Sequence, residues 1–292
     1  MMIDEALLNR SAKEGALNRD DVEGLFSTHD ILSLGVIADE KRKLTSGNKV
    51  SYVRVMKHQF DKPLQNKVLP SATEVRLTGT PTSVADAIAA VESAKLIVGE
   101  RFLSGFSLAN LSELTRDGGL LEALRGLKQA GLDMVSELPL DNCARPETAI
   151  ENLAESGFKQ VRLTIQKVQK ENRVELLMCA RMLCEQYPIT FAINPLPTRF
   201  DGLRPTTGFD DTRLVALARI VTNISTIQVD WQQYGPKLAQ VALMFGADDL
   251  DNVSGLDTSP NGLRRAPVAE VQQNVKAAGF IPEERNGYFK VP

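Results

Sequence analysis

Residues 227–255 read IQVDWQQYGPKLAQVALMFGADDLDNVSG, and this stretch decides the fold that the sequence predicts. A short apolar run at residues 226–230 precedes a helical pattern at residues 236–245, and a second apolar run follows at residues 249–253. Strand, helix and strand in this order form the repeating unit of a parallel sheet. In barrels built from such units, the loops after the strands carry the active site. The carboxylates of this stretch are therefore candidate functional groups.

The same alternation recurs along the chain. Strands are predicted at residues 50–55, 74–78, 102–108, 134–138, 160–165, 189–193, 226–230 and 249–253. Helices are predicted at residues 83–96, 120–130, 146–155, 172–185, 210–219, 236–245 and 268–278. About eight such units around one core predict an α/β fold, a (β/α) TIM-type barrel that is complete or incomplete. An open, doubly wound sheet is the alternative.

The chain divides into a helical lead-in at residues 1–46 and a barrel domain with a C-terminal helix at residues 47–292. In the lead-in, Ser27 or Thr28 is expected to cap a helix with one apolar face. A chain of 292 residues also permits two domains, but one is the first choice.

Three glycines mark the ends of predicted helices. Gly131, Gly157 and Gly246 each stand just before the next apolar run, and each is expected to take the left-handed conformation that ends a helix.

Composition restricts the function classes. Lys and Arg number 34 against 37 Asp and Glu, so no broad basic field favours nucleic acid. No apolar run reaches the length of a membrane span, and the polar N-terminus is unlike a signal peptide, so a cytoplasmic protein without a membrane partner is expected. Three cysteines fit a reducing compartment, and two histidines give little material for a His-rich metal site.

Three blocks carry a family resemblance: INPLPTRFDG at residues 193–202, WQQYGPKLAQVALMFGADDLD at 231–251 and AGFIPEERNGYF at 278–289. They resemble the C-terminal half of the radical S-adenosylmethionine enzymes that make aminofutalosine and cyclise dehypoxanthine futalosine in menaquinone biosynthesis. The deazaflavin-cofactor synthase subunit is similar too. Weaker matches extend the resemblance over residues 20–285, including the helix and strand LSLGVIADEKRKL and KVSYVRV.

The resemblance implies a [4Fe–4S] cluster and S-adenosylmethionine, with three closely spaced cysteines directly after Val55. This chain has MKHQFDKPLQNK at residues 56–67, without a cysteine. Thiolates are the soft ligands that such a cluster requires. Cys143, Cys179 and Cys184 lie far along the chain: Cys143 follows another predicted strand, and Cys179 and Cys184 are expected to be ordinary core or semi-buried thiols of one helix. We therefore predict no cofactor and no metal ligands.

The candidate ligand-binding residues follow predicted strands and should line the barrel mouth. They are Glu137, Asn142, Arg162, Asn194, Asp230, Trp231, Tyr234, Asp251 and His58. No catalytic residue is assigned.

Several of these candidates have two interpretations. Glu137 and Arg162 are expected to pair, as a structural contact or as a ligand clamp. Trp231 either forms an aromatic wall of the mouth or packs in the core. His58 is either an acid–base group or a solvated loop residue.

The acidic cluster before and within the last predicted strand also has two interpretations. Among Asp248, Asp249 and Asp251, one is expected to face solvent. For Asp248 a structural role is favoured. For Asp251 the sequence supports a pocket position and a structural role equally.

Two functions remain open. The first is a cluster-free homologue that binds a small molecule, or acts as an accessory protein beside a cluster-bearing paralogue or a second copy of itself. The alternative is an enzyme of the futalosine pathway, or a lyase or acid–base enzyme that uses the retained barrel-top pocket. A radical enzyme with a cluster on the three remaining cysteines is disfavoured, because their spacing lacks a compact ligand loop.

Overall fold

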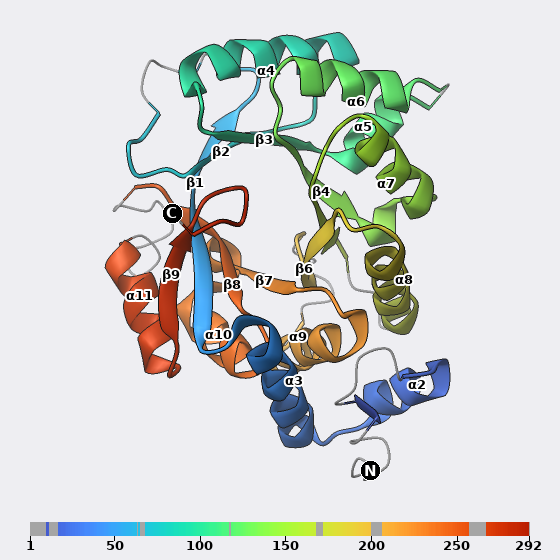
Figure 1. Ribbon diagram of the computed structural model, residues 1–292, viewed down its shortest axis with the longest axis vertical. Coiled ribbons are helices and arrows are strands. Elements are labelled where there is room, and N and C mark those ends of the chain that lie inside the picture. Colours follow the sequence, from blue (N-terminus) through green and yellow to red (C-terminus); the bar gives the residue numbers. More distant parts are fainter. Residues whose placement is uncertain are drawn as a thin grey trace.

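The computed structural model describes residues 10–11, 17–62, 64, 68–116, 118–167, 172–199, 206–256 and 267–291. Its strands are β1 (Lys49–Gln59), β2 (Glu74–Thr78), β3 (Phe102–Ser107), β4 (Met134–Pro139), β5 (Val161–Ile165), β6 (Thr190–Pro197), β7 (Thr226–Asp230), β8 (Asp249–Ser254) and β9 (Ile281–Arg285). Neighbours from β2 to β8 pair in sequence order, and β1 pairs with both β2 and β8. This closes a parallel barrel (Figure 1), so the TIM-type barrel is confirmed and the open sheet is wrong.

Helices surround the barrel (Figure 1). They are α2 (Arg19–Ser27), α3 (Ile31–Ser46), α4 (Val84–Val98), α5 (Leu108–Leu114), α6 (Leu120–Gln129), α7 (Pro146–Glu155), α8 (Arg173–Gln186), α9 (Gly208–Thr222), α10 (Trp231–Met244) and α11 (Val268–Ala277), with a 3-10 turn η1 (Leu140–Asn142). The helices predicted between residues 83 and 278 are all present, and α5 is an additional one that starts directly after β3. Residues 1–9 and 12–16 of the predicted helical lead-in lie outside the described residues. None of the helices in the described ranges is long and apolar enough to cross a bilayer.

The helix ends follow the predicted glycines, with one error at a helix start. Gly131, Gly157 and Gly246 have φ of 103°, 86° and 103°, as expected for left-handed ends. Asp30, not Ser27 or Thr28, caps α3, because its carboxylate accepts a hydrogen bond from the Ser33 backbone N–H at 3.1 Å. Thr28 instead follows the last turn of α2.

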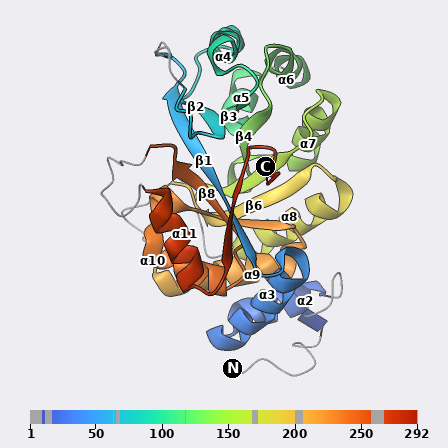
Figure 2. The same cartoon turned by 60° about the vertical axis from the view of Figure 1, so that its left-hand side comes forward.

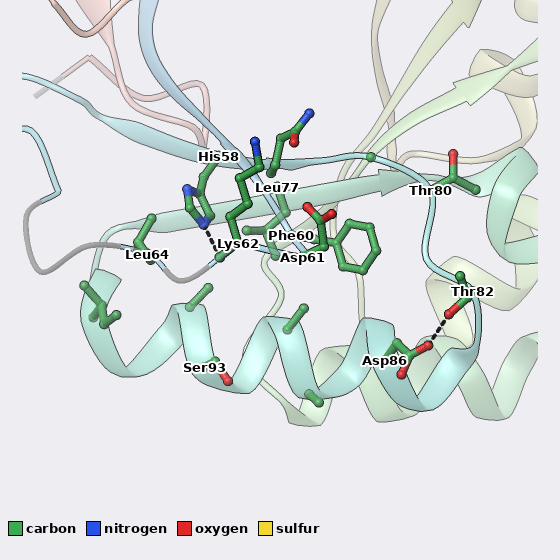
Figure 3. Close-up of a pocket in the computed structure, with 16 residues that line it drawn as sticks. His58, Phe60, Asp61, Lys62, Leu64, Leu77, Thr80, Thr82, Asp86 and Ser93 are labelled. Atoms are coloured by element: carbon green, nitrogen blue, oxygen red, sulfur yellow. Dashed lines mark hydrogen bonds between the residues drawn. The ribbon is translucent and has the colours of Figure 1, made fainter.

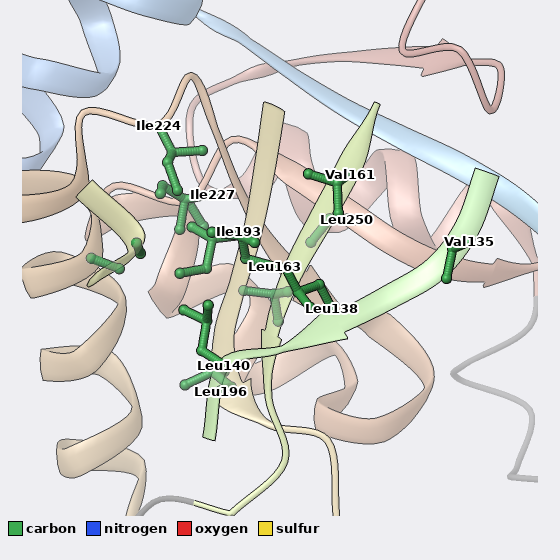
Figure 4. Close-up of a cluster of buried hydrophobic side chains, with 14 of the residues drawn as sticks. Val135, Leu138, Leu140, Val161, Leu163, Ile193, Leu196, Ile224, Ile227 and Leu250 are labelled. Carbon is green, nitrogen blue, oxygen red and sulfur yellow. The ribbon is translucent and has the colours of Figure 1, made fainter. Parts of the chain in front are cut away.

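Strand alternation separates an apolar outer core from a polar barrel interior. On β2, Val75 and Leu77 belong to the hydrophobic core, while Glu74 and Arg76 take part in the buried ion pairs described below. Figure 4 shows apolar side chains from β4 to β8 gathered in the core. The charges inside the barrel need partners, because a buried unpaired charge is costly.

Strand β9, which the sequence pattern did not predict, lies parallel to the first half of β1 (Figure 2). Arg285 at its end is buried and pairs with Asp249 at the start of β8, with Nε–Oδ2 and Nη2–Oδ1 distances of 2.5 and 2.8 Å. The guanidinium lies 3.9 Å from the centre of the Phe289 ring, and the Tyr288 ring packs edge-on against Phe102, the first residue of β3. The AGFIPEERNGYF block therefore covers the base of the barrel, opposite the ends where active sites lie.

Candidate functional site

A polar cavity of about 280 Å³ opens at the C-terminal ends of the barrel strands. Five of the predicted residues line it, namely Glu137, Arg162, Asn194, Asp230 and Asp251. Residues that the sequence reasoning did not select also line it, among them Lys57, Arg76 and Arg199.

Asp251 is the centre of the ion network below this cavity. Arg76 donates to both of its carboxylate oxygens, at 3.0 and 2.9 Å, and Arg162 donates at 2.6 Å. Arg76 also donates to Glu74 at 2.7 Å. Burial alone would raise the pKa of Asp251, but Arg162 and Arg76 outweigh it and hold that pKa well below its usual value. Asp251 is thus ionised, and both arginines are occupied by it.

An irregularity in β8 brings Asn252 to the neighbouring carboxylate. The register between β1 and β8 shifts beside Tyr52 and Arg54, and Asn252 has φ of 60°. Such bulges redirect side chains, often beside functional sites. Here the Asn252 amide donates to both oxygens of Asp230 at 2.9 Å.

Asp230 ends β7 and caps α10, where it accepts a hydrogen bond from the Gln233 backbone N–H at 2.9 Å. Burial raises its pKa above the usual value, and this effect outweighs the opposing influence of Lys57 and of its hydrogen bonds. The carboxyl group is therefore able to exchange a proton closer to neutral pH than an exposed aspartate.

Lys57 enters the cavity because β1 does not end at Val55. The strand continues to Gln59 and pairs with β2, with Lys57 opposite Arg76 and His58 opposite Leu77. Since side chains alternate along a strand, Lys57 faces the barrel interior and His58 faces away from it.

Lys57 is a cation without a fixed partner. No hydrogen bond or ion pair joins its Nζ to another residue in the described part of the chain. The open mouth leaves the side chain exposed, yet loss of water around the ammonium lowers its pKa, with Arg76 acting in the same direction and Asp230 against it.

The expected pair of Glu137 with Arg162 does not form, although both line the cavity. Arg162 is held by Asp251 and by the Ser136 carbonyl, to which its Nε donates at 2.9 Å. Glu137 accepts hydrogen bonds from Thr164 at 3.0 Å and from the Gln166 amide at 3.3 Å. The prediction was wrong because Asp251 reaches Arg162 from the far side of the barrel. Glu137 is left without an ion pair among the described residues.

His58 does not lie where the sequence predicts it, at the barrel mouth. Its Nε2 lies 2.7 Å from the Lys62 carbonyl oxygen, and the ring lines a separate groove of about 930 Å³ beside α4 (Figure 3). Phe60 lines the same groove and packs edge-on against Phe106. His58 therefore does not lie at the barrel mouth.

Three further candidates do not line the central cavity. Trp231 is fully buried in the core, in agreement with the packing interpretation. The Tyr234 hydroxyl donates to the Pro197 carbonyl at 2.7 Å. Asn142 donates to the Gln166 side chain at 3.3 Å and lines two adjacent grooves of about 660 and 310 Å³.

The acidic cluster has no solvent-facing member, contrary to the prediction. Asp248, Asp249 and Asp251 are all at most 4% exposed. Asp248 pairs with Arg219 at 2.8 Å and accepts from the Ile227 backbone N–H at 2.8 Å, which is a structural role. Each carboxylate is buried because each has an arginine partner.

The donor set near β1 does not fit a thiolate-bound cluster. Cys143 follows η1, and Cys179 and Cys184 lie on α8. Burial raises the pKa of all three thiols, that of Cys179 to about 11, whereas cluster ligands are thiolates. Within the described ranges, His, Cys, Asp and Glu nowhere gather in a group of three that could hold a metal ion.

Comparison with known sequences identifies relatives. Residues 192–291 match the family model for the CofH/MqnC C-terminal region. The 5-amino-6-(D-ribitylamino)uracil–L-tyrosine 4-hydroxyphenyl transferase 1 of Methanosarcina barkeri is 29% identical over 58% of this chain and 44% of its own length. The cyclic dehypoxanthine futalosine synthase of Streptomyces coelicolor is 25% identical over 56% of this chain and 48% of its own length. The match thus spans less than half of each of these relatives.

Comparison with solved structures shows the fold. Methylornithine synthase (PylB) aligns with a TM-score of 0.68 at 13% identity, over 94% of this chain and 97% of its own. The [FeFe]-hydrogenase maturase HydG aligns with a TM-score of 0.67 at 13% identity, over 95% of this chain and 74% of its own. At this identity the likeness concerns architecture alone.

The matched region contains the three blocks that carried the resemblance, and its described residues include the elements from β6 to β9. Residues 192–291 of this chain are therefore similar to the C-terminal region of the CofH/MqnC family, and the two named relatives extend the similarity over more than half of the chain.

Proposed function

We propose that this protein is a cluster-free relative of the CofH/MqnC enzymes that binds a small carboxylate-bearing molecule in the barrel-top cavity and performs no radical chemistry. The observation that carries the proposal is the extension of β1, which places Lys57 in the cavity where the resemblance implies a cysteine-bearing loop. In this position the chain forms a strand without cysteines, so it provides no thiolate ligand for an iron cluster.

The charges of the cavity support an anionic ligand group. Arg76 and Arg162 are occupied by Asp251, but the side chains of Lys57 and Arg199 have no ion pair within the described ranges. Both line the cavity. Two cations beside an open polar cavity attract and orient a carboxylate.

The ligand also needs hydrogen-bonding groups besides its carboxylate. Glu137 and Asp230 line the cavity as acceptors, and neither has an ion pair within the same ranges. The curated relatives named above include a transferase whose name contains L-tyrosine, a small molecule that carries both a carboxylate and an ammonium group. L-Tyrosine is therefore a reasonable first probe.

An acid–base enzyme is the second candidate function, and one observation favours it. The pKa of Lys57 is lowered and that of Asp230 is raised, so the two groups approach each other in proton affinity within one cavity. Pairs of groups tuned in this way perform proton transfer in many enzymes. A protein partner and a cytoplasmic location remain predictions from the sequence.

The binding proposal is tested by isothermal titration with L-tyrosine and with 4-hydroxyphenyllactate, a carboxylate of similar size without an ammonium group. Loss of a charged contact costs about 1.5–3 kcal/mol, so Lys57→Met and Arg199→Met are each expected to weaken binding about tenfold or more. Lys62→Met is the matched control, because Lys62 lines the separate groove beside α4. Equal affinity in wild type and both cavity variants, or no binding of either probe, would contradict the proposal.

A further inference from the structure

We propose that Lys57 binds a 2-oxo acid covalently, as an imine between its Nζ and the ketone carbon, at the mouth of the barrel. This inference rests on the proposed binding function and names the class of ligand and the residue that captures it. A lysine imine needs three things: an amine that faces the ligand, a neighbouring group that moves protons, and a separate group that holds the carboxylate.

The first requirement is met by the geometry of β1. Pairing of Lys57 with Arg76, in a strand whose alternate residues face the interior, directs the amine into the cavity. No hydrogen bond or ion pair in the described ranges holds the amine, whereas two other cations that line the cavity, Arg76 and Arg162, are each held by Asp251.

The electrostatic surroundings favour the neutral amine that a nucleophile needs. Desolvation lowers the pKa of Lys57, and Arg76 and Arg162 contribute in the same direction because they are like charges. Desolvation of the ammonium and neighbouring cations both activate a lysine nucleophile by lowering its pKa. For every unit by which its pKa falls, a lysine has about ten times more neutral amine at neutral pH.

Asp230 meets the second requirement. It lines the same cavity and interacts electrostatically with Lys57, and its carboxyl is fixed by Asn252 and by the Gln233 backbone. Its raised pKa suits a group that takes a proton and returns it.

The third requirement is met by cations and amides that remain beside Lys57. Arg199 lines the cavity, and its guanidinium has no ion pair in the described ranges. Asn194 also lines it, with its side-chain oxygen occupied by the Leu196 backbone N–H at 3.2 Å, so its amide N–H₂ is the group left for a ligand. These donors suit the carboxylate of the oxo acid.

The step balances without a redox partner. The Lys57 ammonium gives a proton to Asp230, and the neutral amine attacks the ketone carbon, so that a C–N bond forms and the C=O π bond breaks. The carbonyl oxygen takes up the proton from Asp230 and a second proton from the nitrogen, and it leaves as water. The products are a protonated imine and one water molecule, with the same total charge as the ammonium and the ketone.

The test uses the full chain, pyruvate as the oxo acid and sodium borohydride as the trapping reagent, followed by peptide mass spectrometry. Reduction of the imine is expected to fix the pyruvate skeleton, less one oxygen atom, on the peptide that contains Lys57. The surface lysines outside the cavity serve as internal controls, because no neighbouring groups hold the oxo acid beside them, and their adducts should be about tenfold or more less abundant.

Two variants separate chemistry from folding and from binding. Lys57→Arg keeps the charge and is expected to lose the adduct while its unfolding curve stays like that of wild type. Lys62→Arg, on the neighbouring groove, is expected to keep the adduct. The pH at which trapping reaches half of its maximal rate should be lower than the ordinary lysine pKa of about 10.4.

The outcomes distinguish this inference from the proposed function. Binding of 4-hydroxyphenyllactate without any adduct at Lys57 would overturn the imine and leave the binding function standing. Neither binding nor adduct would overturn both. An adduct spread evenly over exposed lysines would also overturn the assignment to Lys57.

Discussion

Arg76 on β2 donates two parallel hydrogen bonds to Asp251 on β8, at 3.0 and 2.9 Å, across the inner face of β1. Because β1 lies between these two strands, the pair joins its two neighbours at the place where the barrel closes. Both side chains are at most 8% exposed. The pair therefore links the two strands on either side of β1 and forms part of the floor of the cavity.

Replacement of Asp251 by Asn is expected to destabilise the protein by about 3–5 kcal/mol, because it leaves the buried Arg162 without a charged partner and Arg76 with Glu74 alone. Chemical denaturation at pH 7 measures the change in the free energy of unfolding. Glu122→Gln is the matched control: Glu122 pairs with Arg125 on the surface and is 72% exposed, so a change below about 1 kcal/mol is expected. Equal small changes in both variants would show that the buried pair contributes little.

The same pair predicts a pH dependence. The pKa of Asp251 is lower in the folded protein than in the unfolded chain, so its contribution to stability is present above the unfolded value of about 3.9 and is lost as the pH falls toward the folded pKa. Unfolding free energies of wild type and Asp251→Asn should therefore converge below about pH 4. A constant difference down to pH 2 would contradict this account.

Arg285→Ala is expected to destabilise the barrel by about 3–5 kcal/mol, since it leaves Asp249 buried and unpaired at the base. Lys49→Ala is the control, because Lys49 is 61% exposed where it pairs with Glu283 on the same strand β9. Thermal and denaturant unfolding measure the loss of stability in each of the two variants. If the two variants lose equally little stability, β9 is not an integral strand of the barrel.

The three thiols are expected to react slowly with iodoacetamide at pH 8 in the folded protein. Burial raises their pKa values, that of Cys179 to about 11, so little thiolate is present. Unfolding in guanidinium exposes the thiols to water and should raise their reaction rates to those of ordinary cysteines. Rapid alkylation of the native protein, detected by mass spectrometry, would contradict the partly buried placement of these residues against the core.

The sequence predicts the barrel well because its signals are local. Alternating apolar runs and helical patterns identified each strand from β2 to β8, and glycines marked the helix ends. Strand β9 escaped prediction because IPEER is charged and contains Pro282, and only its pairing with β1 makes it a strand.

The candidate site was only partly predictable. Residues at strand ends, such as Glu137 and Asp230, were found because position along a strand is a local property. Arg76 was missed inside the run EVRLT, where it looked like part of a strand, although a charge within an apolar run was the available signal. Arg162 and Asp251, which pair with each other, are 89 residues apart in the chain, and no sequence periodicity specifies such pairs.

The extension of β1 has the largest consequence for function and was also missed. The sequence pattern predicts that this strand ends at Val55. Pairing of Lys57 with Arg76 continues the strand instead, and it turns Lys57 into the cavity and His58 away from it.

Anaerobic reconstitution with iron and sulfide tests most directly our proposal that this barrel holds no iron–sulfur cluster. After removal of loosely bound metal, the account predicts iron and sulfide far below one cluster per chain, no charge-transfer absorption in the visible range, and the same result for a variant with all three cysteines replaced. About four irons and four sulfides per chain, with the spectrum of a [4Fe–4S] cluster that disappears in the cysteine variant, would contradict it.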